Sequence, residues 1–262
     1  MDLSKFSGKT ALITGASSGI GDSFARLLAA AGTHLLLVAR REQRLLQLAD
    51  HLRSQHGIVV DIIAMDLSAE NAAYQLHQKV REKDLQIDLL INNAGMGKHG
   101  DYVNATLEEH HQMINLNIVA LNDLSYLFGK DMIERGSGYI LLVGSIASFV
   151  AVPRFATYAA TKAYVLSLGE ALGKELAPHG IVVTTLCPGG TTTEFMDISG
   201  QQIDGIRTLA MMSSESVAKT GLRGLLHKRR VVVPGLLYKI SIISLRLFPR
   251  RLQALFGQMA TD

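Results

Sequence analysis

The chain reads Thr14-Gly15-Ala16-Ser17-Ser18-Gly19-Ile20-Gly21 directly after its first short apolar run, and a helical pattern begins at once. Glycines let the backbone turn tightly and approach a ligand, while a helix N-terminus offers unpaired N–H groups and a positive dipole end. The spacing is G-x-x-x-G-x-G rather than the commoner G-x-G-x-x-G. An ordinary strand-to-helix turn is the alternative. Its place in the first strand–helix unit nevertheless favours a loop that binds the phosphates of a dinucleotide.

Short apolar runs alternate along the chain with longer segments of helical period. The runs cover residues 10–14, 35–38, 59–64, 89–91, 139–143, 182–186 and 231–233. They do not alternate apolar and polar side chains, as is typical of strands that helices cover on both faces. Gly32 and Gly57 follow the helical segments 22–31 and 41–56, where a left-handed residue is wanted. The pattern predicts an α/β fold with a doubly wound parallel sheet of about seven strands, of the Rossmann type.

No low-complexity linker divides the 262 residues, so we expect a single domain. Residues 1–234 are assigned to the dinucleotide-binding and catalytic Rossmann domain, with 193–213 as an insertion on the substrate side. Residues 235–262 are expected to form a C-terminal amphipathic helical tail.

The composition excludes several classes of protein. With 48% hydrophobic and 19% charged residues, the chain is neither disordered nor collagen-like. Cys187 is the only cysteine, which excludes an intramolecular disulfide and a cysteine-based zinc site within this chain. The histidines show no helix-spaced pair with a third ligand, since His110 and His111 are adjacent and face different ways, so no metal is expected. The N-terminus lacks a secretory signal pattern, and we expect a cytoplasmic protein.

The net charge of +3 is unevenly distributed. From residue 222 onward there are eight basic residues and one acidic residue, so the basicity belongs to the C-terminal part. This local excess, without aromatic or groove-reading elements, does not indicate a nucleic-acid-binding protein.

The second predicted strand ends in Val38-Ala39-Arg40-Arg41. In dinucleotide-binding units, an acidic residue about twenty positions after the glycine loop binds the ribose hydroxyl and repels a 2′-phosphate. Here two guanidinium groups stand instead, and these can pair with a phosphate. The alternative is that they merely cap a solvated helix. Because cations at a helix N-terminus oppose its dipole, the phosphate interpretation is favoured, and the cofactor is predicted to be NADP(H).

Two further positions carry interpretations that the sequence leaves open. Asp66 ends the third predicted strand, where it could accept a hydrogen bond from an adenine amino group or cap the next helix. Cys187 stands before Pro188 at a strand end, where a small buried apolar role is favoured over that of a nucleophile.

Tyr158 and Lys162 lie four residues apart in a helical segment and therefore on one face. A free tyrosine has a pKa of about 10, too high for acid/base work near neutrality, and a neighbouring cation lowers it. A surface pair of no function is the alternative, because this spacing also arises by chance.

These motifs together resemble the classical short-chain dehydrogenase/reductase family over residues 5–193. The motifs that carry the resemblance are the glycine loop 14–21, Asp66, Asn92-Asn93-Ala94-Gly95, Asn117, Ser145, Tyr158 with Lys162, and Pro188-Gly189. Ser145 precedes Tyr158 by thirteen residues, the spacing of this family. The departures are small: Thr191 replaces an aliphatic residue, and the helical asparagine sits in Asn115-Leu116-Asn117.

The resemblance implies an NADP(H)-dependent oxidoreductase with four catalytic residues. Tyr158 would exchange a proton with the substrate oxygen, Ser145 would position that oxygen, and Lys162 would bind the nicotinamide ribose and lower the tyrosine pKa. Asn117 would hold a water that links Lys162 to solvent. The residues expected to contact the cofactor are Gly15, Ser17, Ser18, Gly19, Ile20, Gly21, Arg40, Arg41, Asp66, Leu67, Asn92, Ala94, Gly95, Tyr158, Lys162, Pro188, Gly189, Thr191 and Thr193.

Some of these assignments have structural alternatives. Asn92 to Gly95 more readily shape the floor of the cofactor site than perform chemistry. For Thr191, which could bind the nicotinamide carboxamide with Thr193, plain loop structure is equally supported. A non-catalytic NADP(H)-binding sensor or scaffold is the second hypothesis for the whole protein, and the intact catalytic four argue against it.

The substrate is expected to be a small apolar carbonyl or alcohol compound. Apolar side chains cluster in the segments around the expected site, at Ile146, Phe149, Val150, Phe155, Phe195 and Met196. These would suit a ketone, steroid or acyl chain better than a sugar or charged acid. The alternative is that they pack the core.

The sequence of the tail predicts a helix over residues 236–248, which Pro249 should end. Lys239, Arg246 and Arg250 fall on one narrow stripe of it, and the rest of its surface is more apolar than that of a solvated helix. The charges interrupt every run that could span a membrane. A partner subunit of a homodimer or homotetramer, or the rim of the enzyme's own pocket, is the favoured cover. Peripheral contact with an anionic membrane is the alternative.

Overall fold

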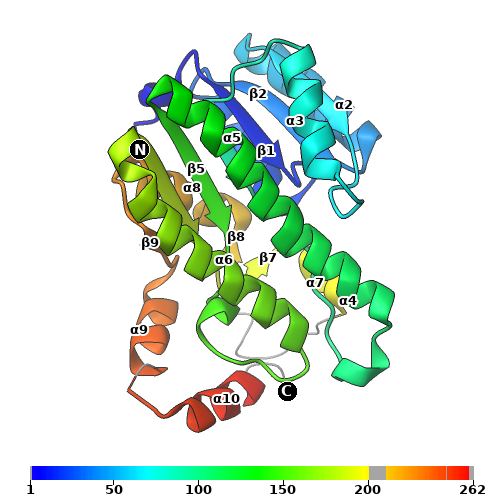
Figure 1. Cartoon of the computed structure of the whole chain (residues 1–262), viewed down its shortest axis with the longest axis vertical. Helices are drawn as coiled ribbons and strands as arrows, with labels where there is room; N and C mark the ends of the chain where they lie inside the picture. The colour runs from blue at the N-terminus through cyan, green and yellow to red at the C-terminus, as the bar shows by residue number, and fades with distance from the viewer. Residues whose placement is uncertain (1, 201–210, 246, 260–262) are drawn as a thin grey trace.

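The computed structural model describes residues 2–200, 211–245 and 247–259 (Figure 1). Its main sheet is parallel and has seven strands in the order β3-β2-β1-β4-β5-β6-β9. The strands are β1 Thr10–Thr14, β2 His34–Ala39, β3 Val60–Ala64, β4 Leu89–Asn92, β5 Gly138–Val143, β6 Ile181–Leu186 and β9 Val231–Val232. The predicted Rossmann-type sheet is confirmed, because each apolar run of the sequence became one of these strands.

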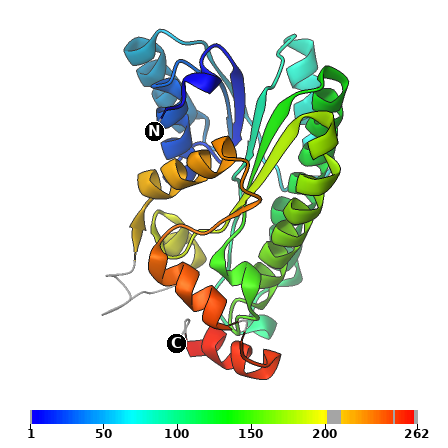
Figure 2. The same cartoon turned by 90° about the vertical axis from the view of Figure 1, so that its left-hand side faces the viewer.

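Helices cover the sheet on both faces (Figures 1 and 2). One layer consists of α1 Gly19–Ala29, α2 Glu42–His56 and α8 Ser214–Leu226, which bury their apolar faces with the sheet in one core. The other layer consists of α3 Ala72–Glu82, α5 Leu121–Arg135 and α6 Ala156–Glu175, which form the second core. The strand order reverses between β1 and β4, and in such sheets ligands bind at the carboxyl ends of the strands beside the reversal.

Shorter elements connect these layers. They are η1 Ser4–Phe6, η2 Tyr102–Asn104, α4 Leu107–Ile114, the π-helical η3 Asn115–Ala120, η4 Ile146–Phe149, η5 Ala177–His179, β7 Thr191–Thr192, α7 Phe195–Ser199 and β8 Met212–Ser213. The strands β7 and β8 pair in a separate two-stranded sheet and so tie both ends of the predicted insertion 193–213 together. Residues 201–210 of that insertion lie outside the described residues.

Of the two helices expected to end at a glycine, one does so and the other ends earlier. Gly57 caps α2 in the left-handed conformation, at φ +63°. The predicted helix 22–31 instead begins at Gly19 and ends at Ala29, while Gly32 at φ +79° lies in the following turn. The early start arises because the last residues of the glycine loop already form the first helical turn.

The helix predicted over 236–248 is confirmed from Leu236 to Leu245, and a second helix that the sequence did not predict follows it. The tail forms two helices, α9 Leu236–Leu245 and α10 Arg250–Met259, with Pro249 directly before the second. Proline cannot continue the hydrogen bonding of a preceding helix, but its fixed φ suits a helix start. Arg246, one member of the predicted basic stripe, lies outside the described residues. Figure 2 shows both helices beyond the carboxyl ends of the strands.

The tail returns to the main domain. Helix α9 contacts η4, and Gly257 of α10 packs so closely on the carbonyl of Ala151 that a side chain there would clash. No helix within the described residues is long and apolar enough to cross a membrane.

Candidate active site

A cleft of about 940 Å³ opens at the carboxyl ends of the strands. Most of the residues expected from the sequence line it: Gly15, Ser17, Ser18, Gly19, Ile20, Arg40, Arg41, Asp66, Leu67, Ala94, Gly95, Ser145, Tyr158, Lys162, Pro188, Gly189, Thr191 and Thr193. The fold thus gathers loops from six different strand ends around one space.

The glycine loop forms one end of this cleft. Gly15 and Gly19 have φ values of +66° and +58°, which favour glycine. Ser18, the N-cap of α1, makes no side-chain capping bond, so the first N–H groups of that helix are available to an anion. Gly21 lies behind the loop, where a side chain would strike the carbonyl of Gly15. It therefore acts through packing and does not line the cleft.

Asn93 connects the glycine loop to β4, a role that the sequence analysis missed. Its Nδ2 donates to the carbonyl oxygens of Thr14 and Gly15, at 2.9 and 3.2 Å. Asn92 points elsewhere. Its Nδ2 donates to Ser125 Oγ at 3.0 Å, and the side chain is buried outside the cleft lining. Asn92 thus braces β4 against α5, because successive residues of a strand point to opposite faces.

The two predicted phosphate arginines differ in their surroundings. Arg41 reaches the glycine loop, where its Nη2 donates to Ser17 Oγ at 3.1 Å and Ser18 Oγ at 2.8 Å. Arg40 is 65% exposed and lies 3.9 Å from a carboxylate oxygen of Asp66. The structure therefore places Arg41, more than Arg40, over the loop that would hold a phosphate.

Asp66 does not cap the next helix. Its Oδ1 accepts hydrogen bonds from the backbone N–H and the hydroxyl of Ser68, at 2.9 and 2.8 Å, which closes a local turn. Helix α3 begins later, after Asn71. Asp66 lines the cleft, and its second carboxylate oxygen lies 3.9 Å from Arg40 Nη1.

Tyr158 lies on α6 beside aromatic neighbours. The ring centroids of Phe155 and Phe195 are 5.5 and 5.4 Å from its own. Removal of the phenol from water raises the pKa of Tyr158 to about 12, and a hydrogen bond with Ser145 opposes this shift. The sequence-based expectation of a lowered tyrosine pKa is therefore wrong for the protein alone. The phenol keeps its proton at neutral pH, which suits a proton donor.

Lys162 is buried behind the tyrosine. Its Nζ lies 5.8 Å from the centroid of the Tyr158 ring and donates to the carbonyl oxygen of Val143 at 2.9 Å. Burial lowers the pKa of Lys162 to about 8. The ammonium is thus mostly charged at pH 7 and loses its proton as the pH rises through about 8.

Asn117 lies in η3, the π-helical interruption between α4 and α5, and is fully buried. Its Oδ1 accepts from the backbone N–H of Met96, and its Nδ2 donates to the carbonyl of Met96 and to Thr161 Oγ1. These contacts occupy the side chain, which does not line the cleft. Asn117 thus fixes the loop after β4. A side chain at Gly95 would come within 3.2 Å of both Asn117 Oδ1 and Lys162 Nζ.

Ser145 stands at the end of β5. Its Oγ accepts from the backbone N–H of Ala147 at 3.1 Å, which fixes the hydroxyl at the start of η4. Cys187 is fully buried nearby, and burial raises the pKa of its thiol to about 12. An un-ionised buried thiol is a poor nucleophile, in keeping with the apolar role predicted for it.

The segment after β6 forms part of the lining of the cleft. Thr191 Oγ1 donates to the carbonyl of Gly189 at 2.9 Å, and Thr193 Oγ1 accepts from the N–H of Phe195 at 3.3 Å. Both threonines line the cleft, although these hydrogen bonds also serve the loop itself.

The far end of the cleft is apolar. Five of the six apolar residues proposed from the sequence line it: Ile146, Val150, Phe155, Phe195 and Met196. Phe149 is not among the lining residues, which corrects that assignment. The tail adds five more lining residues, which the sequence did not assign individually: Tyr238, Ile240, Ile242, Leu245 and Phe248. The one signal in the sequence was the apolar character of this segment, which indicated that part of α9 packs against another surface.

Tyr238 attaches the tail to the loop after β6. Its hydroxyl accepts a hydrogen bond from the N–H of Gly190 at 3.1 Å, and its ring leaves no room for a side chain at Gly189. The tail is thus a wall of the cleft.

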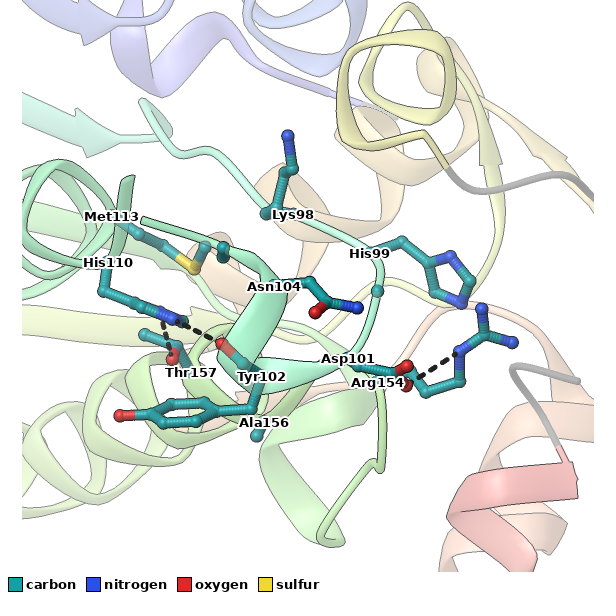
Figure 3. Close-up of a pocket in the computed structure, with 12 residues that line it drawn as sticks. Lys98, His99, Asp101, Tyr102, Asn104, His110, Met113, Arg154, Ala156 and Thr157 are labelled. Carbon is teal, nitrogen blue, oxygen red and sulfur yellow. Dashed lines mark hydrogen bonds and ion pairs between the residues drawn. The ribbon is translucent and has the colours of Figure 1, made fainter. Parts of the chain in front are cut away.

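A second pocket of about 70 Å³ lies beside η2 and holds His110 (Figure 3). His110 Nε2 is 3.0 Å from the carbonyl of Tyr102, and its Nδ1 is 2.8 Å from Thr157 Oγ1, so both ring nitrogens have partners. This space would hold only a few waters. Among the described residues, no three His, Cys, Asp or Glu side chains are grouped to hold a metal ion.

The family model described as short chain dehydrogenase matches residues 9–204, three quarters of the chain. The protein belongs to the short-chain dehydrogenase family. An uncharacterised oxidoreductase of Staphylococcus saprophyticus is 35% identical over 185 residues, 71% of this chain and 79% of that one. The ketoacyl reductase HetN of Nostoc is 29% identical over 88% of this chain and 80% of its own. The very-long-chain 3-oxoacyl-CoA reductase of Ajellomyces capsulatus is 36% identical over 69% of this chain, but over only 55% of that longer protein.

Solved structures of short-chain dehydrogenases share this fold. The enzyme from Sphingobium yanoikuyae, solved in complex with NADPH, is 35% identical with a TM-score of 0.82, over 90% of this chain and 92% of that one. A bulky-bulky ketone specific alcohol dehydrogenase from Comamonas testosteroni is 31% identical with a TM-score of 0.78, over 91% and 92%.

Proposed function

We propose that this short-chain dehydrogenase reduces the carbonyl group of an apolar substrate with NADPH, and that Tyr158 is the proton donor. The observation that carries this proposal is the protonated phenol of Tyr158, which contacts Ser145 between the glycine loop and an apolar space. A phenol that holds its proton at neutral pH can donate it to a developing alkoxide, whereas it would first have to lose that proton to act as a base. The direction of reduction is favoured for this reason.

The cleft suits a nicotinamide dinucleotide on its own geometry. The available N–H groups of α1 would hold the pyrophosphate, Arg41 the 2′-phosphate, and Asp66 the adenine. Lys162 would bind the nicotinamide ribose, and the threonines of the segment after β6 the carboxamide. The nicotinamide supplies the hydride when bound.

The chain's own residues then handle the proton. Ser145 would orient the substrate oxygen toward Tyr158, which is an effect of position more than of acidity. Tyr158 transfers its phenolic proton to that oxygen and becomes a phenolate. The buried Lys162 ammonium stabilises this anion, because a charge is felt strongly where water is excluded. Asn117 holds the loop that packs against Lys162.

A non-catalytic cofactor sensor is the less favoured function. Ser145, Tyr158 and Lys162 all line one cleft and face the same space as the glycine loop. A protein that only binds a dinucleotide needs no proton donor beside an apolar chamber. The convergence of these groups therefore favours catalysis.

The substrate class follows from the lining of the far end. Its aliphatic and aromatic side chains suit a ketone, a steroid or an acyl chain. Two proteins similar to this one are named for the reduction of ketoacyl compounds. A screen that follows NADPH oxidation against carbonyl compounds of graded chain length tests both the reaction and the substrate class. Failure with every apolar carbonyl would contradict the proposal.

We expect NADPH to be preferred over NADH by at least about tenfold, because charge-assisted contacts to a phosphate contribute roughly 1.5–3 kcal/mol. The double variant Ala39→Asp with Arg40→Ser should shrink or invert this preference, since a carboxylate there repels the phosphate and binds the ribose. The measurement is kcat/KM for both cofactors. Arg81→Ser, exposed at the end of α3, removes the same charge away from the cleft and serves as control. Equal use of both cofactors by the wild type would contradict the proposal.

The outer surface of the tail has exposed apolar side chains that could bind a partner. Leu236, Leu237, Ile243 and Leu247 are 62–82% exposed. The tail helices carry Lys239, Arg250 and Arg251 and no acidic residue. We propose that this surface meets an anionic membrane, while the opposite side of α9 lines the cleft. The family resemblance further favours a homodimer or homotetramer.

The protein should therefore sediment with vesicles that contain anionic lipid, and less so as the salt concentration rises. Replacement of the exposed pair Leu236 and Leu237 by serine should abolish this sedimentation without loss of turnover. Neutral vesicles are the control. A protein that stays in the supernatant at low salt, as a dimer that depends on the same two leucines, would assign the surface to a subunit interface instead.

A further inference from the structure

Three consecutive residues, Thr193 to Phe195, line the cleft and contact separate parts of it. The Thr193 methyl group covers Gly19, where a side chain would come within 3.0 Å of it. The Phe195 ring lies beside Tyr158, at 5.4 Å between centroids. Between them, Glu194 turns toward the arginines of α2. This short segment therefore links the glycine loop, the arginines and the tyrosine.

Glu194 forms ion pairs with two arginines. One carboxylate oxygen accepts from Arg41 Nη1 at 2.7 Å, and the other accepts from Nη1 of Arg44, one helical turn further along α2. Hydrogen bonds from Arg44 and Arg41 lower the pKa of Glu194 to about 2, so the carboxylate is ionised at any physiological pH. Arg44 was not singled out by the sequence analysis, which considered only the end of β2.

The Glu194 carboxylate occupies arginine donors that could also bind a phosphate. Arg41 binds Glu194 through Nη1 while its Nε and Nη2 contact the serines of the glycine loop. The guanidinium fork pairs with carboxylate and phosphate oxygens alike. The side chains of Arg41, Arg44 and Glu194 are 39%, 47% and 38% exposed. Ion pairs this exposed are weak, so a phosphate dianion could displace the carboxylate.

We infer that Glu194 competes with the 2′-phosphate of NADP(H) for Arg41, and that Arg44 is a further specificity-determining residue that binds this phosphate. The inference rests on the proposed NADPH-dependent function and deepens it. Glu194 then sets how tightly the phosphorylated cofactor binds. Because Phe195 is the next residue, displacement of Glu194 also loosens the contact of Phe195 with Tyr158 and reaches the substrate end of the cleft.

The experiment measures dissociation constants for NADPH, NADH and adenosine 2′,5′-bisphosphate, the last being a probe that carries the 2′-phosphate without a nicotinamide. Glu194→Gln should bind NADPH and the bisphosphate about three- to tenfold more tightly, because the competing charge is gone, while NADH binding changes less than about twofold. Arg44→Gln should weaken the two phosphorylated ligands by about the same factor and leave NADH unaffected. Glu215→Gln removes an exposed carboxylate paired with Lys219 on α8 and is the matched control.

A second readout tests the link to the substrate end. With saturating NADH, which carries no 2′-phosphate to displace Glu194, Glu194→Gln should change KM for the carbonyl compound by at least about twofold, because Phe195 has lost its anchor. Glu215→Gln should leave that KM unchanged.

Two outcomes would overturn the inference. If Glu194→Gln weakens NADH, the carboxylate binds the ribose hydroxyls instead of competing with a phosphate. If it leaves NADPH and the bisphosphate unchanged, the ion pairs are only a surface feature. The bisphosphate separates these results from failure of the proposed function: tighter binding of this probe by Glu194→Gln supports the competition even in a protein that oxidises no NADPH.

Discussion

Tyr158→Phe is expected to reduce turnover by at least about 100-fold, because the change removes only the proton that Tyr158 transfers. Cofactor binding should stay within a few-fold of the wild type, since the ring and its contacts with Phe155 and Phe195 remain. The measurements are kcat for carbonyl reduction and the dissociation constant for NADPH. A variant that retains a tenth or more of the activity would exclude Tyr158 as the proton donor.

The same helix offers a matched control for this change. Tyr164 donates a hydrogen bond to Asn122 Oδ1 at 2.8 Å and does not line the cleft. Tyr164→Phe therefore deletes a phenolic hydroxyl from α6 outside the site, and kcat should be unchanged. Comparable losses in both variants would indicate damage to the helix instead of loss of a proton donor.

Lys162→Ala should reduce turnover by at least about 100-fold as well, but it should also weaken NADPH binding several-fold. Two causes act together. The variant loses the charge that stabilises the Tyr158 phenolate, and it loses the group proposed to bind the ribose. Joint measurement of kcat and the NADPH dissociation constant distinguishes this pattern from that of Tyr158→Phe, in which binding is kept.

Folding of the Lys162 variants needs a separate check, because the ammonium is buried and bonded to the carbonyl of Val143. Lys162→Met fills similar space without a charge, and its thermal midpoint should be close to that of the wild type, since an ion no longer has to be buried. Lys174→Ala, exposed near the end of α6, is the control for loss of a lysine. An inactive Lys162→Met that is well folded and still binds NADPH as the wild type does would restrict Lys162 to the proton step.

The contacts of the arginines near the glycine loop could be predicted from the sequence only in part. The sequence placed Arg40 and Arg41 at the end of a strand, and therefore near a phosphate, but it ranked them equally. The structure turns Arg41 onto Ser17 and Ser18, leaves Arg40 exposed, and adds Arg44. The contact of Glu194 with Arg41 could not be predicted from the sequence, because the two residues lie about 150 positions apart in the chain. Only a folded chain brings such groups together.

The pKa of Tyr158 illustrates the same limit for chemistry. The spacing of Tyr158 and Lys162 was enough to place them on one helix face, and it predicted a lowered tyrosine pKa. The direction of the Tyr158 pKa shift depends on how much water reaches the phenol and on which group the Lys162 ammonium contacts. Both depend on residues elsewhere in the fold. Burial wins, because desolvation of the phenol outweighs its hydrogen bond with Ser145, while Lys162 Nζ donates to the carbonyl of Val143.

The sequence by itself determined the parallel sheet, the glycine loop and the shared face of Tyr158 and Lys162. These depend on local periodicity and on residue types whose conformational preferences act over a few positions. The tertiary structure alone decided that Asn92 braces β4 against α5 and that Asn117 fixes the loop after β4. It also decided that the tail forms two helices, α9 and α10, and that the tail lines the cleft. Those outcomes depend on contacts between segments distant in the chain, whose geometry no local pattern encodes.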